Sequence, residues 1–347
     1  MQSMMHPRWT LATLSLFVLL MFGVGSIAQA KTLKIATVAP DGTTWMKQLR
    51  AGAAEIRERT NERVRIKYYP GGVMGDTATV LKKMRIGQLH GGAFTGADLA
   101  RFYPDAQLYS LPLLFRSSDE VDYVRERIDP LLINGLRDKG MVALGISNGG
   151  FAYFMATAPL RSISDLKGRK VWAPEGDRLT QSIFAAAGIS AVPLSVADVY
   201  TGLQTGLIDT IAGIPTGVIA FQWHTSISHL THVPLMFLSG MLAVDAKVFS
   251  RISDADQAIT RAVMARIFRD LDEANRKDNL AALEALRKQG ITFVEPDDGQ
   301  LVSWQAMADT ALENIQKDGA FSADILEKMM AHLYNYRSQT VSNAQQP

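Results

Sequence analysis

The sequence contains no cysteine among its 347 residues. This absence excludes a disulfide framework, a lipid-modified cysteine and a thiol nucleophile. The chain also lacks a marked charge of either sign, because 36 Lys and Arg residues stand against 34 Asp and Glu residues and no concentrated basic run occurs. We therefore expect no nucleic-acid partner, since nucleic-acid binding depends on clustered positive charge.

Sequence signatures of catalytic and metal sites are absent as well. The chain has no HExxH pair, no Gly-x-Ser-x-Gly elbow, no phosphate-binding loop and no Rossmann fingerprint. His224, His229 and His232 lie close in sequence, but scattered histidines are more often structural than metal-bound. We expect no metal, no cofactor and no enzymatic activity. The alternative, a periplasmic lyase or hydrolase, would need a nucleophile or general base that no motif reveals.

Only the amino terminus carries an apolar run of near-membrane length. Arg8 is the one charged side chain of the first thirty residues, the apolar run extends from Leu11 to Val24, and Ala28-Gln29-Ala30 follows it. This order is typical of a secretory signal peptide. We expect cleavage near Ala30/Lys31 and a soluble protein in the periplasm.

The first part of the remaining chain has a βαβαβ pattern. Alternation of apolar residues predicts strands, Pro and Gly mark the breaks between elements, and Asp76 can cap a helix. The predicted elements are a strand at 33–38, a helix at 43–60, a strand at 64–69, a helix at 76–86 and a strand at 91–95. This order favours a largely parallel sheet covered by helices on both faces.

A second set of strands and helices follows a helix predicted at 118–139. Its strands are expected at 141–146, 151–156, 171–174, 191–193 and 208–214, with helices at 177–187 and 196–203. The segment from Asp254 to Gln289 contains no Pro or Gly, which predicts one long helix or two nearly collinear ones. At 1.5 Å per residue such a helix is about 50 Å long and could brace two lobes at once.

Aromatic residues recur where the predicted strands end or the helices begin. Trp45, Phe94, Phe151, Tyr153 and Trp172 have such positions. Aromatic faces supply apolar contact and can stack on a planar or cationic group, so these residues are candidates for a ligand cleft between the lobes. The alternative for each of them is ordinary core packing.

Charged residues gather after the strand at 171–174. Asp177 is first of all a candidate helix cap. Arg178 in the first turn of that helix could clamp a carboxylate or sulfonate, although a salt bridge to Glu175 or Asp177 is equally compatible with the pattern.

Several stretches, taken in order, resemble the solute-binding component of tripartite ATP-independent periplasmic (TRAP) transporters, of the dicarboxylate-binding type. The matching stretches are Ile35–Pro40, Gly71–Asp76, Leu111–Phe115, Ile163–Val171 and Asp198–Asp209. The resemblance implies an α/β, two-lobed periplasmic-binding-protein fold (type II-like) with a long helix bracing both lobes. It also implies a receptor that binds an organic acid, closes by a hinge, delivers its ligand to the subunits of a membrane permease and catalyses nothing.

On this fold we expect lobe one to comprise residues 31–150 plus about 240–275, and lobe two 151–239 plus about 276–336. Residues 337–347 are expected to form a flexible tail, because they are rich in Ser, Asn and Gln. The sequence leaves the oligomeric state open. It also leaves open whether the receptor serves a permease or a chemosensory partner.

The chain departs from the family where a ligand carboxylate is usually bound. Trp172 and Ala152 occupy the positions of two arginines that the resemblance leads us to expect, and Ala212-Gly213-Ile214-Pro215 replaces a Glu-Asn-Pro segment. We therefore expect Trp172, Trp45 and Tyr153 to form an aromatic pocket. Arg178, backbone N–H groups or the hydroxyls of Thr44 and Thr95 would receive an anionic group. The candidate ligand-binding residues are Asp41, Thr44, Trp45, Asp76, Phe94, Thr95, Phe151, Tyr153, Trp172, Glu175, Asp177, Arg178, Gly213 and Pro215.

Two acidic residues open an alternative for the ligand. If Glu175 or Asp177 points into the cleft, the solute could be zwitterionic or cationic, held by charge and cation–π contact.

Overall fold

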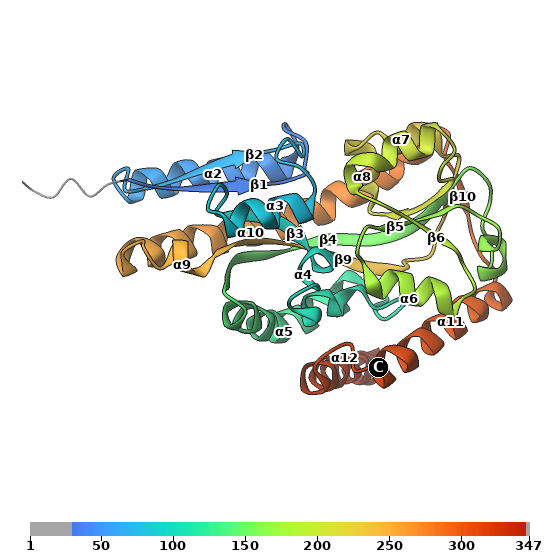
Figure 1. Ribbon diagram of the computed structural model, residues 1–347. Helices are drawn as coiled ribbons and strands as arrows, with labels where there is room; N and C mark the ends of the chain where they lie inside the picture. The colour runs from blue at the N-terminus through green and yellow to red at the C-terminus, as the bar shows by residue number, and fades with distance from the viewer. Residues whose placement is uncertain (1–29, 345–347) are drawn as a thin grey trace, which may run out of the picture.

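A single mixed β-sheet runs through both lobes of the molecule (Figure 1). The structure is a computed structural model that describes residues 30–344, so the expected signal peptide lies outside the described residues apart from Ala30. The strand order is β2-β1-β3-β9-β4-β7-β5-β6, with β8 and β10 branching from β4. The two-lobed α/β fold expected from the sequence is confirmed.

The first lobe contains the predicted βαβαβ unit. Its elements are β1 (Lys31–Ala36), α2 (Thr44–Arg59), β2 (Val64–Tyr69), α3 (Thr77–Arg85) and β3 (Gly91–Thr95), followed by α4 (Gly96–Leu99) and η1 (Pro104–Ser110). Strand β1 pairs in parallel with both β2 and β3. Local chemistry sets the helix starts, because Thr43 and Asp76 accept hydrogen bonds from the backbone N–H groups of Met46 and Thr79.

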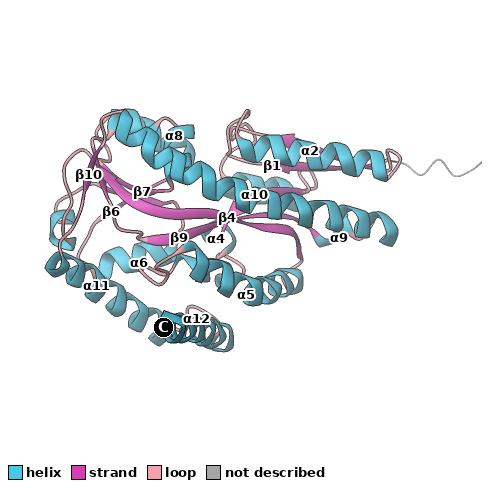
Figure 2. Cartoon of the chain, turned by 180° about the vertical axis from the view of Figure 1, so that it is seen from behind, coloured by secondary structure: helices cyan, strands magenta, loops and turns pink. Residues whose placement is uncertain are grey.

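Strand β4 (Met141–Ala156) is one continuous strand of 16 residues, where the sequence predicted two strands. It pairs antiparallel with β9 (Met236–Asp245), and the pairing shifts register between Asn148 and Gly150. Figure 2 shows β4 running through the centre of the molecule from one lobe to the other. The Gly149-Gly150 pair, which lies between the two predicted strands, forms a bulge within β4, and Gly150 has a positive φ of 116°.

The second lobe is built on the far end of β4. Its strands are β5 (Val171–Pro174), β6 (Ala191–Leu194), β7 (Thr210–Gly213), β8 (His229–Thr231) and β10 (Thr292–Val294). Its helices are η2 (Ile163–Leu166), α6 (Arg178–Ala186), η3 (Val196–Asp198), α7 (Val199–Gln204), α8 (Pro215–Ala220), η4 (Trp223–Ser226) and α11 (Asp298–Lys317). Strand β5 is parallel to β6 and β7, whereas β7 is antiparallel to β4.

Helix α10 (Asp254–Lys288) is one helix of 35 residues and contacts both lobes. It follows the short helix α9 (Ala246–Phe249) and starts at Ser253, whose side chain accepts from the N–H of Asp256. Its first half contributes Val263, Ile267 and Leu271 to the core of lobe one, and Leu286 near its end joins the core of lobe two. The predicted bracing helix is therefore confirmed (Figures 1 and 2).

The carboxyl-terminal region differs from the sequence expectation. Helix α12 (Ala323–Ala344) packs on α5 (Ser118–Asp138) of lobe one, so residues 323–336 do not pack as part of lobe two. The helix continues to Ala344, so residues 337–344 of the region expected to be a flexible tail are helical. Arg337 ties this helix to lobe one, because its Nε donates to Oε1 of the buried Glu120 at 2.8 Å and its Nη2 donates to the carbonyl of Leu114.

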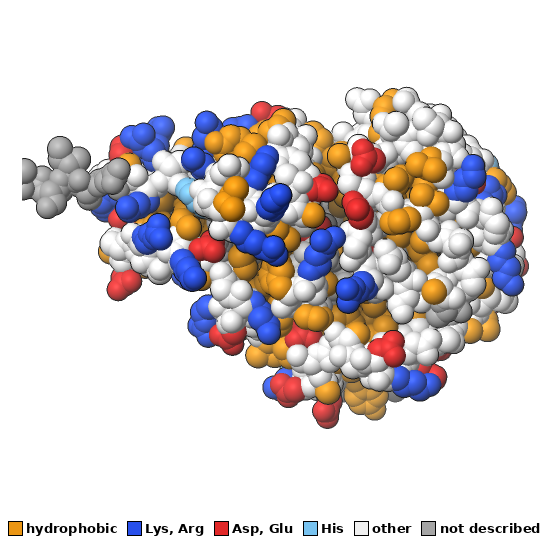
Figure 3. Space-filling view, viewed as in Figure 1, with side chains coloured by type: hydrophobic (Ala, Val, Ile, Leu, Met, Phe, Trp, Pro, Cys, Tyr) orange, Lys and Arg blue, Asp and Glu red, His pale blue; other side chains and the backbone are white. Residues whose placement is uncertain are grey.

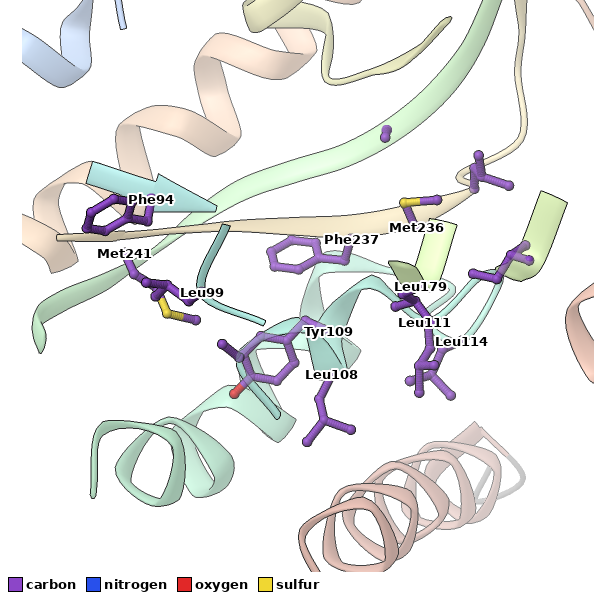
Figure 4. Close-up of a cluster of buried hydrophobic side chains, with 14 of the residues drawn as sticks. Phe94, Leu99, Leu108, Tyr109, Leu111, Leu114, Leu179, Met236, Phe237 and Met241 are labelled. Carbon is purple, nitrogen blue, oxygen red and sulfur yellow. The ribbon is translucent and has the colours of Figure 1, made fainter. Parts of the chain in front are cut away.

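The largest apolar core lies below β3 and β9. Figure 4 shows Phe94, Leu99 and Met241 of this core beside the two strands, with Tyr109 and Leu108 of η1 facing them. Tyr109 is fully buried and donates its hydroxyl to Asp129 of α5 at 2.6 Å. The core thereby fixes η1 and α5 against the strands that end at the boundary between the lobes.

Candidate functional site

A cavity of about 670 Å³ lies between the two lobes. Lobe one contributes the loop before α2, the start of α3 and the end of β3, whereas lobe two contributes the ends of β5 and β6 and helix α8. Helix α10 closes the back of the cavity through residues 275–285. The carboxyl ends of β1, β3 and β5 thus meet at this cavity, as expected for a ligand site in an open α/β sheet.

The wall from lobe one is aromatic and hydroxylated. Thr44 and Trp45 belong to the first turn of α2, and the Trp45 ring meets Phe268 edge to face with centroids 5.9 Å apart. Phe94 and Thr95 end β3, and the Thr95 side chain forms a capping box with Asp98. These residues line the cavity because a loop or helix start follows each strand at this edge.

The wall from lobe two combines backbone with small and aromatic side chains. Pro174 ends β5 and Glu175 follows it, Ser195–Ala197 follow β6, and Thr216, Gly217, Ile219 and Ala220 belong to α8. Phe221 ends this wall and stacks on Trp223, with the ring centroids 5.2 Å apart. Glu175 is exposed and lines the cavity.

The face of α10 toward the cavity is tied to the bulge in β4. Asn275 donates its Nδ2 to the carbonyl of Asn148 at 2.8 Å, and Asn279 donates to the carbonyl of Gly149 at 2.8 Å. Asn279 also accepts from the hydroxyl of Thr216 at 2.9 Å. These bonds hold the long helix, the bulge and helix α8 of lobe two together at one edge of the cavity.

The ionisable residues of the cavity wall are mostly acidic. Among the described residues that line it, Asp76, Asp98, Glu175 and Asp278 carry carboxylates and Arg101 alone is basic. The Thr79 hydroxyl and N–H lower the pKa of Asp76, and the nearby Arg101 guanidinium lowers it further. Figure 3 shows acidic side chains near the boundary between the lobes, while Lys and Arg side chains spread over lobe one.

Arg101 reaches across the boundary between the lobes. It follows α4 of lobe one, and its guanidinium lies against Gly176, in the turn between β5 and α6 of lobe two. A Cβ atom at Gly176 would clash with this guanidinium, and Gly176 has a positive φ of 77°. The positive φ favours glycine at this position, and a larger residue would also displace the guanidinium of Arg101.

The structure brings some of the residues predicted from the sequence together at the cavity. Those that line it are Thr44, Trp45, Asp76, Phe94, Thr95 and Glu175. They come from α2, α3, β3 and the end of β5, so the predicted location of the cleft agrees with the geometry.

Phe151, Tyr153 and Trp172, which the sequence predicted at the cleft, do not line this cavity. Trp172 is only 6% exposed, packs edge to face on Trp223 and donates its Nε1 to the carbonyl of Leu194 at 3.0 Å. Tyr153 stacks on His232 outside the cleft, and Phe151 packs against Phe237. All three side chains point from their strands toward apolar cores, and a strand pattern by itself does not tell which face covers the cleft.

Asp177 has the capping role that its position first suggested. It accepts from the N–H of Thr180 at 3.1 Å and from Nε2 of Gln107 at 2.7 Å, and it is buried. Arg178, which follows it, is exposed and does not line the cavity, so it is not positioned as the predicted carboxylate clamp.

The last three candidates also lie off the cavity wall. Asp41 is exposed and pairs with Arg50 at 2.9 Å. Gly213 is buried, where an added Cβ would meet Val218, and Pro215 is buried at the first position of α8.

Sequence reasoning missed Arg101, Phe221 and the polar residues of α10. The spacing of Asn275, Asp278, Ala282 and Ala285 places them on one face of a helix, and the small alanines among them indicate room beside that face. This pattern could have marked the helix face. No comparable signal precedes Arg101, because the short helix α4 determines its direction.

The histidines considered for a metal have other partners. His232 Nδ1 lies 2.8 Å from Oε1 of Glu295, and His229 Nδ1 lies 2.8 Å from the hydroxyl of Ser228. Within residues 30–344, no three or more His, Asp or Glu side chains are grouped so that they could share a metal ion. In the same part of the chain, no helix combines the length and the apolar character that crossing a membrane requires.

Comparison with known proteins identifies related chains. A solute-binding protein of Chromohalobacter salexigens is 28% identical over 200 residues, which cover 57% of this chain and 59% of that protein, less than two thirds of its length. The sialic acid-binding periplasmic protein of Vibrio cholerae is 21% identical over 296 residues, which cover 83% of this chain and 90% of that protein.

A solved structure shares the fold. The crystal structure of a TRAP periplasmic solute-binding protein from Desulfovibrio salexigens, with bound orotic acid, matches with a TM-score of 0.80 at 18% identity. The match covers 88% of this chain and 99% of that chain. Residues 35–318, which extend from β1 to the end of α11, match a described protein family. The chain therefore belongs to the bacterial extracellular solute-binding proteins of family 7.

Proposed function

We propose that this protein is the extracytoplasmic receptor of a TRAP-type transporter and captures a small organic acid between its two lobes. The observation that carries the proposal is the cavity of about 670 Å³ between the lobes, with β4 and α10 crossing behind it. Its volume lies within the range of about 300–1,000 Å³ found for small-molecule sites. Family membership and the organic acids bound by related proteins support the proposal.

Arg101 is the side chain that we assign to the ligand carboxylate. It is the basic residue of the cavity wall, and a guanidinium can donate two parallel hydrogen bonds to a carboxylate. It takes over the task that the resemblance assigned to arginines at the positions of Trp172 and Ala152, both of which are buried here. Trp45, Phe94 and Phe221 would contact the body of the solute.

The proposal extends to location and partner. Export through the signal peptide, with cleavage near Ala30/Lys31, would deliver a soluble protein to the periplasm. There the closed receptor would dock on the subunits of a membrane permease, which takes over the ligand. A chemosensory partner is the alternative, and binding of the purified permease subunits to the liganded protein would distinguish the two.

A ligand screen with matched arginine variants tests the proposal. The protein purified from the periplasm is screened by thermal shift against carboxylates, sulfonates, aromatic acids and amines, since tight binding raises the unfolding temperature by mass action. For the best acid, Arg101→Ala should weaken binding at least about tenfold, the scale of one lost charge-assisted hydrogen bond. Arg178→Ala is the control, because Arg178 is exposed and lies off the cavity wall. An unchanged affinity in Arg101→Ala would remove Arg101 from the site, and a screen without any hit would contradict the receptor function.

A further inference from the structure

The charge of the cavity wall bears on the chemical class of the ligand. Its described residues include the carboxylates of Asp76, Asp98, Glu175 and Asp278 against the single guanidinium of Arg101. A concave site with one prevailing sign of charge concentrates its potential inside the cavity. The cavity is therefore unfavourable for a solute that carries two carboxylates, because Arg101 can pair with only one of them.

Two of the four carboxylates have structural tasks. Asp76 caps α3 and is held ionised by its hydrogen bonds from Thr79. Asp98 accepts from the hydroxyl of Thr77 at 2.6 Å and from the N–H of Thr95 at 2.8 Å. These neutral donors satisfy the oxygen atoms but leave the negative charge in place.

Asp278 and Glu175 differ from the first pair. Neither side chain has a hydrogen bond or an ion pair with another residue in the described part of the chain, and both line the cavity. On the same helix as Asp278, the carboxylates of Asp272 and Glu273 are paired with Arg125 and Lys277. Asp278 is half-buried at the back of the cavity, whereas Glu175 lies across the cavity on lobe two.

The aromatic lining suits a positive charge. Trp45 and Phe221 line the cavity from opposite lobes, and the faces of such rings attract ammonium groups. Together with Asp278 and Glu175 they provide both of the contacts by which proteins hold an amine or a quaternary ammonium group: a carboxylate and a ring face.

We propose that the ligand is a zwitterion, a small organic acid that also carries an amine or quaternary ammonium group. The carboxylate meets Arg101, and the cationic nitrogen meets Asp278, with Glu175 approaching from lobe two. This assignment rests on the proposed receptor function. It adds that the cationic group of the solute is required for tight binding.

The test measures how binding affinity depends on the charge of the ligand and on the charge of the cavity wall. Isothermal titration measures the binding of glycine betaine, proline and 4-aminobutyrate, and of succinate, butyrate and orotate as acids without a cationic centre. Asp278→Asn removes the charge at the back of the cavity. Asp270→Asn is the matched control, because Asp270 lies on α10 off the cavity wall and pairs with Arg266. Unfolding midpoints of both variants verify that they are folded.

At least one zwitterion should bind more tightly than every acid of the panel. Asp278→Asn should weaken this binding at least tenfold and Glu175→Gln should weaken it less, while Asp270→Asn leaves it unchanged. If succinate, butyrate or orotate binds as tightly as the zwitterions and Asp278→Asn has no effect, the receptor function stands and the zwitterion assignment is wrong. If no compound of the panel binds, both are contradicted.

Discussion

The backbone N–H of Asn148 donates a hydrogen bond to Asp272 at 2.6 Å, at the bulge where β4 passes from one lobe to the other. The other carboxylate oxygen of Asp272 accepts from Arg125 at 2.8 Å, and Arg125 also pairs with Asp129 and donates to the carbonyl of Ile146. A buried arginine of α5 is thus bonded to β4 directly and to α10 through Asp272. The network fixes the two elements that cross between the lobes relative to each other.

Asp272→Asn should destabilise the fold. The substitution keeps an acceptor for the N–H of Asn148 but removes one negative charge from beside the buried Arg125. We expect a loss of about 1–3 kcal/mol in the free energy of unfolding, measured by urea denaturation. Asp270→Asn, two residues earlier, breaks only an exposed pair with Arg266 and should cost less than about 0.5 kcal/mol. If both variants lost the same free energy of unfolding, the network around Arg125 would not contribute to stability.

Asp256 should make stability depend on pH in the acidic range. Its carboxylate accepts two hydrogen bonds from Arg63, at 2.9 and 2.8 Å, and these bonds lower its pKa in the folded protein. The stabilisation is therefore complete above the unfolded pKa of about 3.9 and is lost as the pH falls through the lower folded value. Asp256→Asn should cost about 1 kcal/mol at pH 7, a modest figure because Arg63 is 40% exposed. The difference between the variant and the wild type should shrink below pH 4, as measured by denaturation at several pH values.

Gly176→Ala should impair ligand binding through Arg101. Gly168 offers a matched control, since its φ of 78° equals that of Gly176 within one degree but open space surrounds it. Both alanine variants should lose about 1 kcal/mol of stability through backbone strain. Only Gly176→Ala displaces the guanidinium, so only this variant should show a weaker affinity for the acid found in the screen. The same affinity in both variants would show that the position of Arg101 is irrelevant to binding.

Trp172→Phe should affect stability and leave the ligand unaffected. The indole is buried between β5 and Trp223, and the smaller ring removes both packing and the hydrogen bond to Leu194. A loss of about 1–2 kcal/mol is expected in urea denaturation. Trp45→Phe should behave in the opposite way, with a weaker affinity and a smaller loss of stability, because Trp45 lines the cavity. A larger effect on affinity from Trp172→Phe would place that residue in the site after all.

Local sequence patterns predicted the elements whose ends depend on nearby residues. Asp76 and Asp177 each cap a helix as their side chains suggested, and the helix predicted from residue 43 has Thr43 as its cap. Where the predicted bounds of strands and helices differ from the structure, contacts with residues distant in sequence determine the structure. Strand β4 continues through Gly149-Gly150 because β9 pairs along both sides of the bulge, and Arg337 of α12 is held by Glu120 on the distant helix α5.

The site was predictable only in part for the same reason. Helix starts next to strand ends placed Trp45 and Thr95 at the cleft, since this geometry is local. The direction of Trp172 depends on Trp223, which is distant in sequence, and the approach of Arg101 to Gly176 joins two separate lobes. Contacts of this kind cannot be predicted from the order of apolar and polar residues along the chain.

The continuity of β4 and α10 determines how the receptor can move. The strand keeps its pairing on both sides of the bulge, and the helix has no break along its 35 residues. Neither element can act as a free pivot, so rotation of one lobe against the other has to bend both of them elastically. Any closure of the lobes around a solute would therefore strain both crossing elements, and reopening would relieve that strain.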